Sequence, residues 1–147
     1  MRLVIRNSVA AFCLLILAAC QTPAMQPLNI SNDPQVLYAD NAVHLVYVGA
    51  DNCPYCHSWE GWELKEYSNS PVAAKVYFTW IKAERFQDTG QDAYWPEHLR
   101  WVRDETKATS GTPRFVVLQG RNIKANKKGT GAWKRDVLPL LERLARS

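Results

Sequence analysis

The sequence predicts an α/β fold in which a sheet is covered by helices. Residues Val43–Val48 (VHLVYV) are rich in β-formers and almost all apolar, which is typical of a buried central strand. From Pro54 onward, apolar residues recur at helical spacing instead. Strand-like and helix-like segments continue to alternate in the order β-α-β-α-β-β-α, which predicts an α/β layer architecture. The length of 147 residues allows one domain of ordinary size.

The first half of the domain is predicted to contain a strand, a helix and a second strand. A break at Gly49–Asn52 separates the first strand from the helix. The helix is expected from Pro54 to about Tyr67. Three aromatic residues at i, i+4 and i+7 indicate one shared face of this helix: Tyr55, Trp59 and Trp62. Ser68–Pro71 is a turn signal, and Lys75–Ile81 (KVYFTWI) predicts the second strand.

The second half is predicted to contain a helix, a hairpin and a last helix. Residues 84–95 are polar and predict a loop, and Pro96 stands where a helix can begin. Ser110–Pro113 ends that helix. The hairpin is expected as a strand, a tight turn and a short strand, at Phe115–Leu118, Gln119–Asn122 and Ile123–Ala125. The last helix carries Leu138, Leu141 and Leu144. Asp136 is expected to cap it, which puts Pro139 in the first turn, where a missing N–H costs little.

The first nineteen residues have the layout of a secretory signal peptide. Two arginines precede the short apolar run Val9–Leu17. The residues LAAC that end at Cys20 resemble a bacterial lipobox, in which the cysteine receives a lipid and becomes the new N-terminus. An Asp directly after the lipidated cysteine would resemble an inner-membrane retention signal. This chain has Gln21 at that position, which favours the outer membrane. We therefore expect a signal peptide, a lipidated tether and a domain at residues 1–19, 20–33 and 34–147.

Charge and cysteine count exclude several classes of protein. A net charge of +4 is too mild for a dedicated nucleic-acid binder. Four cysteines are too few for a disulfide-dense scaffold. Cleavage removes Cys13 and lipidation uses Cys20, which leaves Cys53 and Cys56 as thiols. Export places this pair in an oxidising compartment, where a disulfide persists.

The segment Cys53-Pro54-Tyr55-Cys56 is the candidate redox centre. Cys53 is expected at the start of a helix, where the helix dipole and the unpaired N–H groups favour a thiolate over a thiol. Cys53 is then the exposed nucleophile. Cys56 lies one turn further, more buried, and resolves the mixed disulfide. A C-x-x-C pair beside a βαβ pattern is typical of a redox motif.

Three other uses of the cysteine pair stay open. Together with His57, the pair matches the C-x-x-C-H pattern of haem attachment, for which His44 or His98 could supply the second axial ligand. A zinc site requires two more ligands, and the sequence has no second C-x-x-C, so no metal is expected. A purely structural disulfide at this spacing closes a tiny loop and constrains the unfolded chain little.

The sequence resembles the thioredoxin-fold thiol–disulfide oxidoreductases. The resemblance is carried by VHLVYVGADNCPYC and by Ser110–Pro113 followed by FVVLQGRN, and it covers about Val36–Arg146. The CPYC sequence is also that of glutaredoxins, and YCH together with SGTP is similar to periplasmic isomerase and reductase domains of the Dsb type. The resemblance implies the thioredoxin fold, a central mixed sheet flanked by helices, with an extra helical segment before a cis-proline.

The same resemblance implies roles for individual residues. Pro113 is expected to follow a cis peptide bond and to lie beside Cys53. The backbone of Thr112 is then exposed for strand-like pairing with a bound substrate peptide. Pro54 and Tyr55 complete the expected substrate-binding surface. No cofactor is expected beyond the redox-active disulfide itself.

The chain departs from the family pattern at one position that matters for proton transfer. Thioredoxins carry a buried Asp six residues before the first cysteine, and this chain has Tyr47 there. The proton acceptor for Cys56 is therefore left open. The segment Glu84–Thr109 is also longer than that of a minimal thioredoxin.

The sequence predicts a membrane-anchored, extracytoplasmic thiol–disulfide oxidoreductase that exchanges disulfides with protein substrates. The expected partners are protein thiols and disulfides of the cell envelope and a membrane redox partner, and the lipid is expected to bind the membrane. No nucleic acid is expected as a partner. The protein is expected to be a monomer. One alternative is a binding module for envelope assembly or cytochrome maturation without turnover. Another is a c-type haem carrier. Oxidases, reductases and isomerases share this dithiol, so the motif leaves the direction of electron flow open.

Overall fold

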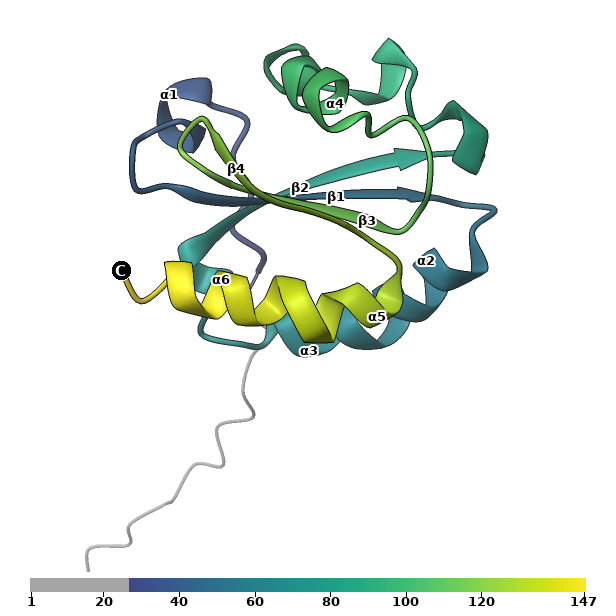
Figure 1. Cartoon of the computed structure of the whole chain (residues 1–147). Coiled ribbons are helices and arrows are strands. Elements are labelled where there is room, and N and C mark those ends of the chain that lie inside the picture. The colour runs from purple at the N-terminus through teal and green to yellow at the C-terminus, as the bar shows by residue number, and fades with distance from the viewer. Residues whose placement is uncertain (1–26) are drawn as a thin grey trace, which may run out of the picture.

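The computed structural model describes residues 27–147 and contains a four-stranded mixed sheet (Figure 1). Its strands are β1 (Val43–Ala50), β2 (Val76–Ala83), β3 (Arg114–Gln119) and β4 (Asn122–Lys128). The strand order is β2-β1-β3-β4, with β1 parallel to β2 and antiparallel to β3. β4 returns antiparallel to β3. The predicted α/β fold with a central mixed sheet is confirmed.

Helices cover both faces of the sheet. They are α1 (Pro34–Leu37), α2 (Pro54–Ser58), α3 (Leu64–Ser68), α4 (Arg100–Thr106), α5 (Thr130–Ala132) and α6 (Leu138–Leu144). Helices α2, α3, α5 and α6 lie along one face, and α4 lies over the other (Figure 1). One π-helical turn, Trp59–Glu63, joins α2 to α3, and another, Trp133–Val137, joins α5 to α6.

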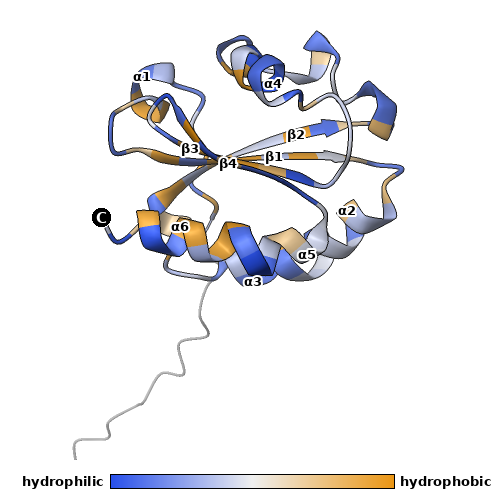
Figure 2. Cartoon of the chain, in the orientation of Figure 1, coloured by the Kyte–Doolittle hydropathy of each residue, from blue (hydrophilic) through white to orange (hydrophobic). Residues whose placement is uncertain are grey.

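Strand β1 lies between β2 and β3 in the sheet, and all of its residues are buried. Neighbouring side chains of a strand point to opposite faces, so β1 supplies two hydrophobic cores. Tyr47 packs with Trp59 and Trp133 on one face, and Val46 packs with Val102 on the α4 face. Each large apolar side chain buried in this way stabilises the fold by roughly 1.5–3 kcal/mol. Hydrophobic and hydrophilic residues alternate in blocks along α6, as expected for a helix with one face on the sheet (Figure 2).

The polar segment after β2 is more ordered than a plain loop. Residues 84–95 contain two 3₁₀ turns, Phe86–Asp88 and Asp92–Tyr94. The indole N–H of Trp95 donates to the Thr89 carbonyl at 2.6 Å, which anchors these turns over the sheet. Together with α4 they form the extra helical segment that was expected before the cis-proline.

The prediction that Asp136 caps the last helix is wrong. The helical run begins earlier, at Thr130. Trp133 is only 1% exposed, so its packing in the core draws this first turn onto the sheet. The π-helical turn Trp133–Val137 then widens the helix directly ahead of Pro139, whose ring and missing N–H disrupt a regular α-helical turn.

The first described residues lie along the edge of the sheet. Asn29 forms a parallel bridge with Tyr77, and its carbonyl accepts the Phe78 N–H at 2.8 Å. Leu28 packs against the core. The segment expected to be a tether up to residue 33 therefore contacts the domain from Leu28 onward. The expected signal peptide and Cys20 lie outside the described residues. Within residues 27–147, no helix is long and apolar enough to cross a membrane.

Candidate active site

The Cys53–Cys56 pair lies where β1 leads into α2. Cys53 is the N-cap of α2 and has extended backbone angles, and Pro54 follows in the first turn, where its fixed φ favours a helix start. The Sγ atom of Cys53 accepts the backbone N–H of Cys56 at 3.2 Å. This contact uses one of the N–H groups that the start of a helix leaves unpaired. The same N–H is placed to donate to a Cys53 thiolate once the disulfide is open.

The two cysteines differ in access to solvent. They are joined as a disulfide, with Cα atoms 5.2 Å apart. Cys53 is 5% exposed and Cys56 is 0% exposed, and both pack with Ala50. A substrate sulfur therefore reaches Cys53 first. The division into an attacking and a resolving cysteine requires this order of access.

The Ser110–Pro113 loop meets the sheet at the same end as Cys53. Arg114 pairs with Val48 near the end of β1, so Pro113 lies just beyond this pair. The Thr112–Pro113 peptide bond is cis, as the resemblance implies. The substrate-pairing role expected for Thr112 stays a prediction.

A buried arginine, which the sequence analysis missed, holds this loop. Arg114 is 3% exposed, and its guanidinium donates to the Ser110 carbonyl and, at 2.7 Å, to the Asn126 side chain. A longer contact of 3.4 Å reaches the Thr106 carbonyl. Burial lowers the pKa of Arg114 from its ordinary value. An arginine at the start of an otherwise apolar strand is the sequence signal that could have identified it.

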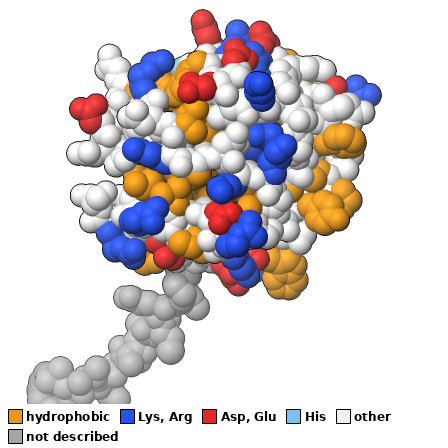
Figure 3. Space-filling model, in the orientation of Figure 1, with side chains coloured by type: hydrophobic (Ala, Val, Ile, Leu, Met, Phe, Trp, Pro, Cys, Tyr) orange, Lys and Arg blue, Asp and Glu red, His pale blue; other side chains and the backbone are white. Residues whose placement is uncertain are grey.

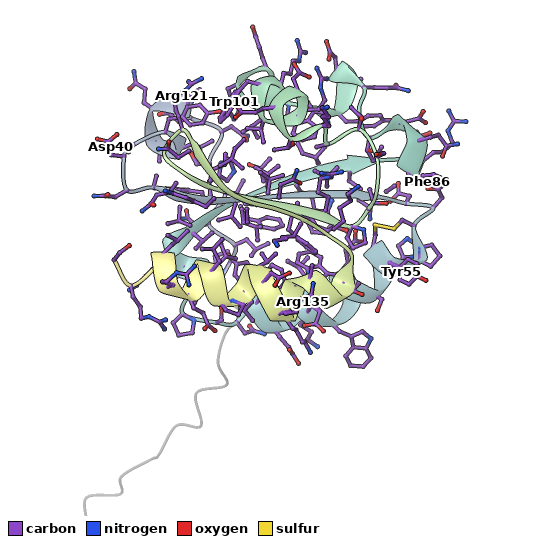
Figure 4. All side chains as sticks on the ribbon, in the orientation of Figure 1. Asp40, Tyr55, Phe86, Trp101, Arg121 and Arg135 are labelled. Carbon is purple, nitrogen blue, oxygen red and sulfur yellow. A yellow bond between two sulfur atoms is a disulfide. The ribbon has the colours of Figure 1, made fainter. Side chains whose placement is uncertain are left out.

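Two exposed aromatic side chains flank the disulfide (Figure 4). Tyr55 is 68% exposed and Phe86 is 52% exposed. The backbone N–H of Phe86 donates to Oδ1 of Asn52 at 2.8 Å, which ties the inserted segment to the loop before Cys53. Figure 3 shows hydrophobic side chains gathered at this edge of the molecule. Neither Asn52 nor Phe86 was predicted as a site residue, because their contact joins segments far apart in the sequence.

The prediction that Tyr55, Trp59 and Trp62 share one helix face is wrong. Trp59 is fully buried, whereas Trp62 is 75% exposed and Tyr55 points outward as well. For Trp62 the cause is the π-helical turn Trp59–Glu63, whereas Tyr55 lies in α2, ahead of that turn. A π turn bonds residue i to i+5, so the faces before and after it no longer follow the α-helical spacing.

A hydrogen-bonded set of four polar side chains, which we call the Lys82 cluster, joins β1, the loop after it, the helical run and β2: Tyr47, Asp51, Glu60 and Lys82. The Tyr47 hydroxyl donates to Glu60 Oε1 at 2.8 Å. Lys82 Nζ lies 2.9 Å from Glu60 Oε2 and 3.0 Å from Asp51 Oδ1. Burial, together with the bond to Glu60, raises the pKa of Tyr47 far above its ordinary value. Burial acts to lower the pKa of Lys82, but both carboxylates outweigh it and raise that pKa.

The backbone is similar to that of solved thioredoxins. Thioredoxin f from spinach chloroplast, short form, aligns with a TM-score of 0.52 and 13% identity over 86% of this chain and 100% of that chain. The chain has the thioredoxin fold. The periplasmic thioredoxin SoxS from Paracoccus pantotrophus aligns with a TM-score of 0.48 and 17% identity, over 71% of this chain and 96% of that chain. Thioredoxin from Aeropyrum pernix aligns with a TM-score of 0.49 and 20% identity, over 75% of this chain and 79% of that chain. The sequence matches no protein-family model and no curated protein.

In this thioredoxin fold, most of the predicted site residues come together at one end of the sheet. The cysteines begin α2, and Pro54 and Tyr55 lie exposed between them in the sequence. Thr112 and Pro113 precede β3 at the same end. Cys20, the expected lipidation site, lies outside the described residues.

Proposed function

We propose that this protein is a lipid-anchored thiol–disulfide oxidoreductase of the bacterial cell envelope. The observation that carries the proposal is the geometry of the cysteine pair. The sulfur of Cys53 is the accessible one and accepts a helix N–H, while Cys56 is completely buried one turn further. The thioredoxin fold around the pair supports the same conclusion.

The proposed reaction is a two-step exchange. In the reducing direction, the Cys53 thiolate attacks one sulfur of a substrate disulfide, the substrate S–S bond breaks, and a mixed disulfide forms. The leaving substrate sulfur departs as a thiolate and takes up a proton. Cys56 then attacks the sulfur of Cys53, which releases the second substrate sulfur and closes the Cys53–Cys56 disulfide. Two electrons pass from the dithiol to the substrate, and the reverse sequence oxidises a substrate dithiol.

The proposed substrates are proteins of the cell envelope that carry thiols or disulfides. A substrate segment crosses Cys53 between Tyr55 and Phe86, and it pairs with the backbone of Thr112. Support comes from the high exposure of both aromatic rings, which are large apolar surfaces with no partner within the described chain. A membrane redox partner returns the cysteine pair to its starting state, and the protein acts as a monomer.

The proposed location is the periplasmic side of the outer membrane. Support comes from the sequence alone: a signal peptide at residues 1–19, a lipobox-like ending at Cys20, and Gln21 after it. Labelling cells with a palmitate analogue tests the anchor. The label is expected on the wild type and not on a Cys20→Ala variant, and separation of the two membranes gives the location.

An exchange assay tests the reaction itself. The full chain, purified in detergent, is expected to accelerate the reduction of insulin disulfides by dithiothreitol. Cys53→Ser is expected to abolish this activity. Cys56→Ser, the matched control, is expected to accumulate mixed disulfides that are visible on a non-reducing gel. Wild-type turnover by the Cys53→Ser protein contradicts the role of Cys53. Absence of turnover by the wild-type protein contradicts the proposed reaction and leaves a binding module.

The direction of electron flow follows from the reduction potential. Equilibration of the full chain in glutathione buffers gives this value, and known proteins with such pairs span about −270 to −120 mV. A value near the low end supports a reductase, and a value near the high end supports a disulfide donor.

A further inference from the structure

We propose that Glu60 takes up the proton of the Cys56 thiol when Cys56 resolves the mixed disulfide. This inference rests on the proposed function and adds a residue to its mechanism. Cys56 is 0% exposed in the disulfide form, so its sulfur is shielded from bulk solvent. A group inside the protein must therefore receive that proton before the sulfur can attack as a thiolate.

Two features of the chain bring Glu60 toward the region of Cys56. Glu60 follows Cys56 by four residues, and Ser58 and Trp59 between them keep α-helical backbone angles. Residues four apart on such a backbone are neighbours on the helix surface. The second link passes through β1. A Cβ atom added to Gly49 would lie 2.5 Å from the Tyr47 hydroxyl oxygen, so this hydroxyl lies against Gly49. The next residue, Ala50, packs against both cysteines, and the Tyr47 hydroxyl in turn bonds to Glu60 at 2.8 Å.

The other polar groups of the Lys82 cluster are not suited to accept the proton. The pKa of Tyr47 is raised, so the hydroxyl keeps its proton and donates a hydrogen bond to Glu60. Lys82 remains an ammonium and has donors only. The Asp51 side chain is 63% exposed, whereas that of Glu60 is 15% exposed. Glu60 is therefore the carboxylate on the inner side of the cluster.

Among the described residues, those on α2 and α5 bring no competing buried acceptor. His57 is exposed on α2. Helix α5, which packs against α2, consists of Thr130, Gly131 and Ala132, and none of these carries an ionisable side chain. Glu63 lies further along the helical run and pairs with Lys134 at 3.0 Å, on the side of the C-terminal helices.

The proposed step balances in charge and electrons. The proton leaves Cys56 Sγ and is bound by the Glu60 carboxylate, so one negative charge moves from the carboxylate to the sulfur. The thiolate attacks the Cys53 sulfur, a new S–S bond forms, and the bond from Cys53 to the substrate breaks. The substrate sulfur leaves with the electron pair. Lys82 stays hydrogen-bonded to Asp51 throughout, so the cluster keeps a cation beside the changing carboxylate.

Single-turnover kinetics of the full chain in detergent test this role. The reduced protein is mixed with a fluorescent peptide disulfide, samples are quenched with acid, and the mixed disulfide is followed between pH 5.5 and 9. In Glu60→Gln, formation of the mixed disulfide is expected at the wild-type rate, while its resolution at pH 7 slows by about 100-fold, as for the loss of a general base. The resolution rate of this variant is expected to rise with pH, because hydroxide then replaces the missing carboxylate.

Glu63→Gln is the matched control. Glu63 is on the same helical run, is paired with a lysine in the same way and has a 20% exposed side chain, but it lies outside the Lys82 cluster. This variant is expected to resolve at the wild-type rate. Glu60→Asp keeps a carboxylate and is expected to recover part of the rate, which separates a proton role from a general loss of structure.

The outcomes distinguish this inference from the proposed function. Resolution by Glu60→Gln at the wild-type rate across the pH range overturns the role of Glu60 and leaves the exchange reaction intact. Equal slowing in Glu60→Gln and Glu63→Gln also overturns it. A wild-type protein that forms no mixed disulfide overturns the proposed function itself.

Discussion

Acid is expected to destabilise this fold through one buried histidine. His44 is 0% exposed on β1, and its Nε2 lies 2.8 Å from the Thr79 hydroxyl. Burial, with a smaller contribution from the nearby His98, lowers the pKa of His44 from 6.5 to about 4. The folded protein therefore holds His44 neutral, while the unfolded chain binds a proton below its ordinary pKa of about 6.5.

The magnitude follows from this difference in pKa. The stabilising contribution is fully present above about pH 6.5 and is lost as the pH falls toward 4, because the unfolded state then binds the extra proton. Each pKa unit corresponds to about 1.4 kcal/mol, so the loss is roughly 2 kcal/mol at pH 5 and roughly 3 kcal/mol near pH 4. This is a large part of a typical unfolding free energy of about 5–15 kcal/mol.

Urea unfolding, followed by tryptophan fluorescence, measures the effect. The wild type is compared with His44→Gln, whose amide can still bond to Thr79 but does not titrate. Other titrating groups are common to both proteins, so their contributions cancel in the difference. Between pH 7.5 and 5, the unfolding free energy of the wild type is expected to fall by about 2 kcal/mol more than that of the variant. Parallel pH profiles would refute the reasoning.

Two further predictions concern the surroundings of the cysteines. Phe86→Ala is expected to lower kcat/KM for a protein disulfide about 3- to 10-fold, because one aromatic contact of about 0.5–1.5 kcal/mol is lost. In Phe86→Ala, turnover of a small disulfide and the reduction potential should stay unchanged. Trp62→Ala serves as the control, because Trp62 is an exposed aromatic on the neighbouring π-helical turn. Equal losses of kcat/KM in both variants count against the role of Phe86. Arg114→Met is expected to lower the unfolding free energy by about 1.5–3 kcal/mol, because the charge-assisted bonds from the guanidinium to the Ser110 carbonyl and the Asn126 side chain are lost. Denaturant titration checks this, and a loss below about 0.5 kcal/mol contradicts it.

The sequence predicted those parts of the fold that depend on local patterns. The apolar run that forms β1, and the junction that places Cys53 at a helix start, follow from residues adjacent in the chain. The cis bond before Pro113 came from the family resemblance and not from composition or spacing. In each case the relevant signal lies within a few residues of the feature.

Features that depend on tertiary packing were not predicted. Trp59 stacks on Tyr47 with ring centroids 4.5 Å apart and meets Trp133 edge-on at 5.1 Å. The π-helical turns beginning at Trp59 and Trp133 lie in this aromatic packing, and no spacing rule for α-helices reveals them. The Lys82 cluster draws its members from β1, from the loop after it, from the helical run and from β2, so no local motif marks it.

The edge of the sheet where the described chain begins has a mechanical consequence. Asn29 joins the sheet beside Tyr77, at the start of β2. The same strand ends at Ala83, whose carbonyl accepts the Asp51 N–H at 2.9 Å in the loop before Cys53. A strand rises about 3.3 Å per residue, so the two ends of β2 are roughly 20 Å apart. A force applied at the N-terminus therefore acts as shear on β2, at the end of the strand that is far from the cysteine loop. An anchor ahead of Asn29 would therefore hold the domain at the end of β2 that is far from the cysteines. The cysteines would then lie at the unattached end of the domain, where they are accessible to substrates.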